Sequence, residues 1–279
     1  MRRCLFLISL LLSSAACSSQ ADYAQRAGVS QDRAAATAVA SAAVAPKAQP
    51  VAFADSAASN GGTREFSYKW PAAVSAEPSL VELLTAERSR ILAAEKKEWA
   101  EAVEGLPPDC GPCRNRSFAK EWKVVANTPG YLSLSSAVST YTGGAHGMQG
   151  LETLVWDRAA GKAMPGGGLF VSAAALDAAL GPKLCSALNR ERARRRGEPV
   201  RADAADPYGT GFNACQTIAD ATVLVGSSTG RAFDRIGLWF GPYVAGPYAE
   251  GVYELDFPVD AAVLRAVKPE FAAAFALGG

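Results

Sequence analysis

Two glycine-rich blocks, each beside a strand-like run, constrain the fold of this chain more than any other feature. The first block runs from Tyr141 to Gly147, and the second, which also contains prolines, runs from Gly241 to Gly251. Glycine allows backbone angles and close approaches that other residues resist, and proline fixes φ. The two blocks, about a hundred residues apart, therefore predict shaped loops on a sheet.

The runs around these blocks have the pattern of strands. Residues Tyr131–Tyr141 place leucine and valine on one face and serine on the other, which is the alternation of a half-buried strand. Six further strands are predicted, at Glu65–Trp70, Trp122–Ala126, Leu151–Asp157, Thr222–Gly226, Arg235–Phe240 and Val252–Phe257.

Three segments have the signals of helices. One begins at Pro78, one runs from Ser172 to about Arg196, and the last covers Val259–Phe275 with an interruption near Pro269. Helices grouped between runs of hairpin-linked strands predict an α+β fold of mainly antiparallel sheet with a few packing helices. We expect two sequence-adjacent halves, residues 63–200 and 201–279.

The first residues have the pattern of an export signal, which we place at residues 1–16. Arginines precede the short apolar run Leu5–Leu12, and small residues lead to Cys17. This order predicts a lipoprotein, with Cys17 lipidated as the mature N-terminus. The usual lipoprotein box has leucine three residues before the cysteine, where this chain has Ser14. The alternative is ordinary secretion with cleavage near Ala16.

The expected location is the periplasmic side of the cell envelope, as an outer-membrane lipoprotein. Ser18 stands where an acidic residue would indicate retention in the inner membrane. Residues 17–62 are rich in small residues and poor in aromatics, so we expect a flexible tether. The formal net charge of +1 implies neither nucleic acid nor an anionic membrane surface as a partner. Contact with the membrane is expected through the lipid alone.

Four cysteines remain outside the signal and the lipidation site, and an even number in an exported protein predicts disulfides. Three pairings are possible. We favour Cys110 with Cys113, which are close neighbours, and Cys185 with Cys215.

Two short motifs suggest chemistry that their surroundings do not support. Cys110 to Cys113 spell a thioredoxin-type dithiol, but they follow a helix and several turn residues instead of a buried strand. Ser117 and Lys120 match S-x-x-K, yet the partner motifs of penicillin-binding proteins are absent from the sequence. A structural disulfide and a chance match are the preferred interpretations, with a thiol oxidoreductase as a minor alternative.

His146 is the only histidine in the sequence, which excludes a site with several histidine ligands. No G-x-S-x-G elbow supplies a serine nucleophile for it. We therefore expect no metal, no cofactor and no complete catalytic constellation, and a binding protein is favoured over an enzyme. An envelope hydrolase that acts on glycans through acidic residues or His146 is the alternative. The arginines near the end of the helix at Arg196 are expected to form a solvated helix end.

The residues of the two blocks resemble a known family. The run Tyr131–Gly147, followed by Trp156-Asp157, Gly161-Lys162 and Leu169-Phe170, resembles the extracytoplasmic domain shared by the RsiV anti-sigma factor and PdaC-type peptidoglycan deacetylases. Tyr68-Lys69-Trp70-Pro71 fits the opening of that domain, and Phe240–Gly251 with Tyr253-Glu254-Leu255 resembles its C-terminal half.

The resemblance implies a binding or sensor module without catalysis of its own. The domain binds lysozyme in the anti-sigma factor, and in the deacetylase a separate metal-dependent domain performs the reaction. We therefore expect an exported module whose partner is a lysozyme-like protein or peptidoglycan. Its candidate binding residues lie in the two blocks: Tyr141, Gly143, Gly144, His146, Tyr243 and Tyr248.

Overall fold

The computed structural model describes residues 47–107, 109–200 and 210–279, which belong to one unit, Lys47–Gly279. The predicted signal peptide, the lipidation of Cys17 and most of the predicted tether lie outside the described residues. Among the helices that the model describes, none has the length and apolarity to cross a membrane.

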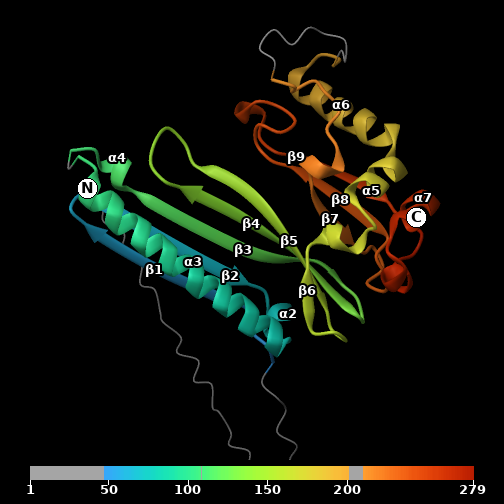
Figure 1. Ribbon diagram of the computed structural model, residues 1–279, viewed down its shortest axis with the longest axis horizontal. Coiled ribbons are helices and arrows are strands. Elements are labelled where there is room, and N and C mark those ends of the chain that lie inside the picture. Colours follow the sequence, from blue (N-terminus) through green and yellow to red (C-terminus); the bar gives the residue numbers. More distant parts are fainter. Residues whose placement is uncertain (1–46, 108, 201–209) are drawn as a thin grey trace, which may run out of the picture. The chain divides into compact units, whose positions relative to one another are not determined.

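A six-stranded sheet forms the first part of this unit, in the order β1-β2-β3-β4-β5-β6 (Figure 1). Its neighbouring strands are antiparallel except for β2 and β3, which are parallel. The strands are β1 (Val51–Ser59), β2 (Gly62–Trp70), β3 (Arg116–Asn127), β4 (Tyr131–Tyr141), β5 (Met148–Asp157) and β6 (Lys162–Met164).

The long helix α3 (Pro78–Gly105) covers one face of this sheet (Figure 1). Strand alternation places the even-numbered residues of β2 on that face, where Phe66, Tyr68 and Trp70 are buried. They form a core with Leu80 and Leu84 of the helix. Two short helices, α2 (Ala72–Ser75) and α4 (Gly111–Arg114), lie at the two ends of α3 in the sequence. The opposite face of the sheet is therefore the one available to the rest of the chain.

The last part of the predicted tether is a strand, so its boundary at residue 62 is wrong. Residues Val51–Ser59 form β1 and pair with β2 along its whole length. The segment contains alanine, serine and aspartate with few large apolar residues, so its sequence lacks the clear alternation of apolar and polar residues that predicts a strand. Backbone pairing with β2 and the contact of Phe53 with Phe66 hold it in place.

A three-stranded antiparallel sheet, in the order β7-β8-β9, forms the second part. Its strands are β7 (Thr222–Gly226), β8 (Arg235–Phe240) and β9 (Tyr253–Pro258). One face packs against the helices α5 (Ala173–Leu180), α6 (Pro182–Arg196) and α7 (Ala261–Ala266) in a second apolar core. The 3₁₀ segments are η1 (Gly166–Leu169), η2 (Ile218–Asp220), η3 (Tyr248–Glu250) and η4 (Pro269–Ala274).

Two predicted helices are interrupted. Gly181 has a φ of 51° and Pro182 follows it, so the predicted helix from Ser172 to Arg196 is divided into α5 and α6. The predicted last helix becomes α7 and η4. The helices α5 and α6 pack with β7–β9 in the second core. The chain therefore passes from the first part to the second near Met164, earlier than the predicted boundary at residue 200.

The fold class is confirmed. The described residues form two mainly antiparallel sheets with packing helices, as expected for an α+β protein in two parts. Both expected disulfides are present, Cys110–Cys113 and Cys185–Cys215.

Candidate functional site

The two glycine-rich blocks meet in space. The His146 ring stacks on the Tyr248 ring with centroids 4.0 Å apart, and the Tyr243 ring lies 5.5 Å from that of Tyr248. The Tyr248 hydroxyl donates a hydrogen bond of 2.9 Å to the Gly147 carbonyl. We call His146, Tyr243 and Tyr248 the aromatic cluster. It joins three of the six predicted binding residues, from segments about a hundred residues apart.

Tyr141, Gly143 and Gly144 shape the first block and lie outside the aromatic cluster. The Tyr141 hydroxyl donates to the Gly144 carbonyl at 2.9 Å and closes the loop. Gly143 has a φ of 93°, and a Cβ atom there would lie 3.1 Å from the Cys113 carbonyl oxygen. The disulfide loop Cys110–Cys113 thus packs against the first block at Gly143, and glycine is required at this contact.

Arginines of α6 hold the second block. The buried Arg192 donates to the Ala245 carbonyl at 2.9 Å, and Arg195 donates to the Glu250 carbonyl at 2.5 Å. Arg196 makes a two-pronged ion pair with the Glu250 carboxylate, with distances of 2.8 and 3.0 Å. The expectation of a solvated helix end is wrong for these three arginines, because each contacts the second block.

Glu250 is ionised in this arrangement. Burial opposes its charge, but the Arg196 guanidinium and the Tyr253 hydroxyl outweigh it and hold the pKa of the Glu250 carboxyl below its usual range. Burial and the hydrogen bond to Glu250 raise the pKa of Tyr253 to about 12. The second block is therefore fixed by a charged network and can present its tyrosines in one geometry.

A groove of about 360 Å³ lies between the two sheets. One wall is the face of the six-stranded sheet opposite α3, and the other comes from the three-stranded sheet. Gln149 and Val252, which line the groove, follow closely after the first and second blocks. We call it the inter-sheet groove; its lining residues are Ser67, Lys69, Ala119, Glu121, Ala137, Val138, Ser139, Gln149, Gly150, Leu151, Trp239, Val252 and Glu254.

The inter-sheet groove is lined by small, aromatic and charged side chains. Small side chains such as Ala119 and Ser139 leave space over the larger sheet, and Trp239 supplies an aromatic wall. Lys69, Glu121 and Glu254 add charged groups of both signs. Such a mixture of apolar surface and a few polar groups is typical of ligand sites. Trp239 could not be recognised in this role from the sequence, because only the packing of the two sheets brings it into the same groove as Ala119.

The motifs considered for catalysis do not assemble into a catalytic site. Ser117 and Lys120 lie on β3, where an odd and an even residue point to opposite faces. Lys120 is buried against α3 and pairs with Glu87 and Glu152 at 2.5 Å each. In the described residues His146 contacts the Gly147 carbonyl and the Tyr243 hydroxyl, and no carboxylate hydrogen-bonds to it. The same residues contain no group of three or more potential metal ligands.

The fold and the site together define an α+β protein with two mainly antiparallel sheets, an inter-sheet groove and an aromatic cluster formed by the two glycine-rich blocks. Residues 60–149, from the β1–β2 turn to the start of β5, match the family model described as deacetylase PdaC, so this part of the chain is similar to that family's domain. The match and the two disulfides indicate an extracytoplasmic, envelope-related module.

Two solved structures of the DUF3298 family are similar to this chain. One, from Bacteroides fragilis, is 16% identical, with 75% of this chain and 89% of that one covered and a TM-score of 0.46. The other, from Pseudomonas aeruginosa, is 18% identical, with coverages of 81% and 95% and a TM-score of 0.44. A search of curated protein sequences found no significant match.

Proposed function

We propose that this protein is an exported binding module that recognises a cell-wall-related partner through the aromatic cluster and the inter-sheet groove. Of the two partners that the family resemblance implies, peptidoglycan is favoured over a lysozyme-like protein. A groove of about 360 Å³ with one aromatic wall and charged groups suits an extended polymer better than the flat surface of a folded protein.

The backbone conformation and exposure of Tyr243 are the observation that carries this proposal. Its φ of 68° lies in the left-handed region, which a bulky side chain adopts only at a cost of about 1–2 kcal/mol. The side chain is 50% exposed, so the core does not require it. Glycine would fit this backbone without strain. A tyrosine in a strained and exposed position is typical of a site where the side chain serves recognition.

The proposal predicts that Tyr243→Gly separates binding from folding. Relief of the strained φ should leave the stability unchanged or raise it by up to about 1 kcal/mol, although glycine gains entropy when unfolded. Retention on purified peptidoglycan should fall at least about tenfold, as expected for loss of an aromatic contact. Sedimentation with peptidoglycan measures binding, urea unfolding measures stability, and immobilised lysozyme tests the other partner.

Asn60→Gly is the matched control. Asn60 is the other described non-glycine residue with positive φ, at 46°, and it lies in the β1–β2 turn. This variant also introduces glycine at a positive φ, although asparagine tolerates that region better than tyrosine, and it should leave retention unchanged. Equal retention of wild type and Tyr243→Gly, or retention by neither peptidoglycan nor lysozyme, would count against the proposed function.

A further inference from the structure

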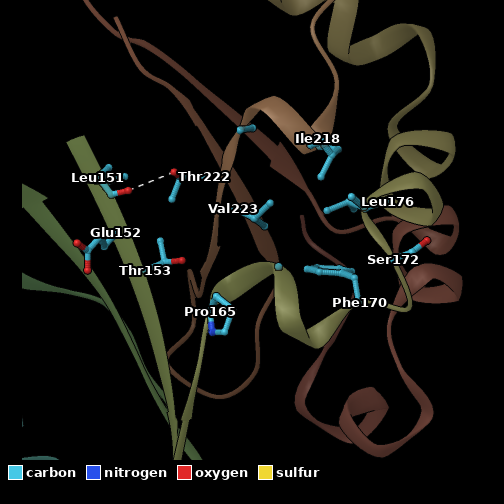
Figure 2. A pocket seen from close by; sticks show the side chains of 14 residues that line it. Leu151, Glu152, Thr153, Pro165, Phe170, Ser172, Leu176, Ile218, Thr222 and Val223 are labelled. Carbon is cyan, nitrogen blue, oxygen red and sulfur yellow. Dashed lines mark hydrogen bonds between the residues drawn. The ribbon is translucent and has the colours of Figure 1, made fainter. Parts of the chain in front are cut away.

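The two outer edges of the six-stranded sheet differ in how far they are covered. Beside β5, Figure 2 shows the hydrogen bond of 3.2 Å that the Thr222 hydroxyl of β7 donates to the Leu151 carbonyl. The Gly166 N–H of η1 donates to the Thr153 hydroxyl at 3.1 Å. The edge strand on this side, β6, has only 3 residues and pairs with Val155–Asp157. This edge is therefore short and covered by the rest of the chain.

The opposite edge is the 9-residue strand β1, whose outer side is open (Figure 1). The turn residues Asn60 and Gly61 have φ values of 46° and 76°, as in a two-residue hairpin of type I′. In such a hairpin the flanking residues, here Ser59 and Gly62, form a hydrogen-bonded pair, so the odd-numbered residues of β1 bond to β2. The residues whose backbone groups point outward are Ala52, Ala54, Ser56 and Ala58. Within the described part of the chain, no hydrogen bond reaches these backbone groups.

Strand β1 lacks the features by which folded proteins keep an exposed edge unpaired. Such features include proline, outward lysine, a β-bulge and a very short strand. β1 has no proline and no lysine, and its register with β2 is unbroken along Val51–Ser59. Its single charged residue, Asp55, pairs with Arg64 and Lys96 of the same chain. An open edge of this length without protection suits pairing with another strand.

The side chains of β1 suit a second copy of the same strand. In an antiparallel pair centred on Asp55, Ala52 lies opposite Ala58, and Ala54 lies opposite Ser56. All four side chains are small and exposed, so two backbones can approach without steric conflict. Each opposed pair exchanges two main-chain hydrogen bonds, which satisfies every outward-pointing residue of both copies.

Other registers satisfy fewer of these groups. A shift of two residues in one direction sets Ala58 opposite Pro50, which has no N–H. A shift in the other direction sets Ala52 opposite Asn60, which belongs to the turn. The register centred on Asp55 is therefore favoured.

The face of β1 toward α3 is also self-complementary in this register. The ring of Phe53 lies opposite the methyl group of Ala57, so a large side chain meets a small one. The two Asp55 side chains meet at the centre, where like charges alone would repel. Each carboxylate has two cations of its own chain as partners, Arg64 and Lys96 at 3.1 Å, which offset this repulsion.

We propose that β1 is an interaction surface for a second copy of this chain. Two β1 strands pair antiparallel about a two-fold axis at Asp55 and join the two six-stranded sheets into one continuous sheet. The surface is isologous, because each copy contributes the same residues to it.

The pairing places both inter-sheet grooves on one face of the continuous sheet. Ser67 and Ala119 line the inter-sheet groove and also the hollow that Ala54 and Ser56 line beside the edge. Opposed residues of antiparallel strands point to the same face, so the two copies present these surfaces side by side. An extended polymer then contacts two grooves at once, which slows its release. This consequence rests on the proposed function, whereas the pairing itself does not.

Sedimentation equilibrium of the whole chain, without any ligand, tests the pairing. A reversible association is expected, with a mass twice that of one chain at high concentration. The Ala54 and Ser56 amides should exchange hydrogen more slowly as the concentration rises. Ala54→Pro removes an outward N–H at an edge strand, where proline is tolerated, and should weaken the association at least about tenfold.

Two double variants test the register with matched charges. Ala54→Lys/Ser56→Lys sets like charges opposite each other in both pairs and should weaken the association about tenfold. Ala54→Lys/Ser56→Asp places charges at the same exposed positions but sets opposite charges against each other, so it should associate at least as well as wild type. Neither variant changes a residue that packs in a core.

A chain that sediments as a monomer at every concentration overturns the proposal. An association that survives both Ala54→Pro and Ala54→Lys/Ser56→Lys also overturns it, because the copies would then meet through another surface. Equal weakening in the two double variants would contradict the register centred on Asp55. A chain that pairs but is not retained on peptidoglycan would contradict the proposed function and leave this interaction surface supported.

Discussion

At the scale of single residues, Glu250 connects the arginines of α6 to the second block. Its carboxylate accepts from Arg196, and the Tyr253 hydroxyl donates to it as well. Arg195 lies over the Tyr253 ring at 4.0 Å from its centroid. Because Tyr248 and Glu250 belong to the same short segment η3, this network also fixes Tyr248 against His146.

The variant Glu250→Gln should therefore destabilise the protein by about 2 kcal/mol, the typical cost of losing hydrogen bonds to charged groups. Arg196 would be left without its carboxylate while still half-buried. The midpoint of urea unfolding measures the effect. Glu254→Gln, an exposed carboxylate on β9, is the control and should change stability by less than about 0.5 kcal/mol. Equal effects of the two variants would contradict the role of Glu250.

This network shows what the sequence could not predict at this scale. The arginines near Arg196 were visible, and the helix dipole alone explains cations at a helix C-terminus. Their partner Glu250 lies more than fifty residues away, in the second block. Only the packing of α6 against β9 brings them together, so the sequence could not distinguish a solvated arginine from one that positions a loop.

At the scale of elements, the strands with regular alternation were predicted well. Tyr131–Tyr141 matches β4 at both ends, because leucine and valine alternate with serine along it. The strand β1 was missed, since its burial depends on pairing with β2 and little on its own side chains. Gly181-Pro182 divides α5 from α6, and this turn signal is visible in the sequence.

The two disulfides fasten elements of different kinds. Cys185–Cys215 joins α6 to a segment 30 residues further along the chain. Cys110 and Cys113 are separated by only 3 positions in the sequence, so their disulfide closes a very short loop. In the chain-entropy model a longer loop gives more stabilisation. We expect the Cys185→Ser/Cys215→Ser variant to lose about 3–4 kcal/mol and the Cys110→Ser/Cys113→Ser variant roughly 2 kcal/mol or less.

Urea unfolding of both double variants under oxidising conditions measures this difference. The two variants serve as controls for each other, because each replaces two thiols with two hydroxyls. A larger loss for the short loop would mean that the Cys110–Cys113 loop stabilises the first block through its contact with Gly143, beyond its effect on the unfolded chain.

At the scale of the whole molecule, the site depends on how the two sheets face each other. The blocks themselves were evident as loops, and the aromatic cluster contains three of the residues named from them. The inter-sheet groove was not predictable, because its walls combine Ala119 and Ser139 of one sheet with Trp239 of the other. Each of these residues alone is an ordinary strand residue, and only tertiary packing makes them neighbours.

Ion pairs distributed over both parts make the whole molecule sensitive to acid. Lys183 and backbone N–H groups at the start of α7 lower the pKa of Asp260, and Arg64 and Lys96 lower that of Asp55. Hydrogen bonds from Arg194, and also from Arg195, lower the pKa of Glu191 to about 2 against the opposing effect of burial. The carboxyl of Glu95 differs, because burial raises its pKa.

These shifts fix the sign of the pH dependence. The carboxyls whose pKa is lowered by folding bind protons in the unfolded chain at pH values near 4, where the folded protein keeps them ionised. Their stabilisation is therefore complete above about pH 5 and is lost as the pH falls toward 2. The urea midpoint should fall across this range with little change in the m-value.

Glu191→Gln tests this account, because the hydrogen bonds from Arg194 and Arg195 lower the pKa of the Glu191 carboxyl to about 2. The variant should be less stable than wild type at pH 6, and the two should converge as the pH approaches 2. Glu121→Gln also removes one exposed carboxylate and should keep the slope of the wild type. If both variants flattened the pH dependence equally, general charge repulsion would be the cause instead of the pairs that Glu191 makes with Arg194 and Arg195.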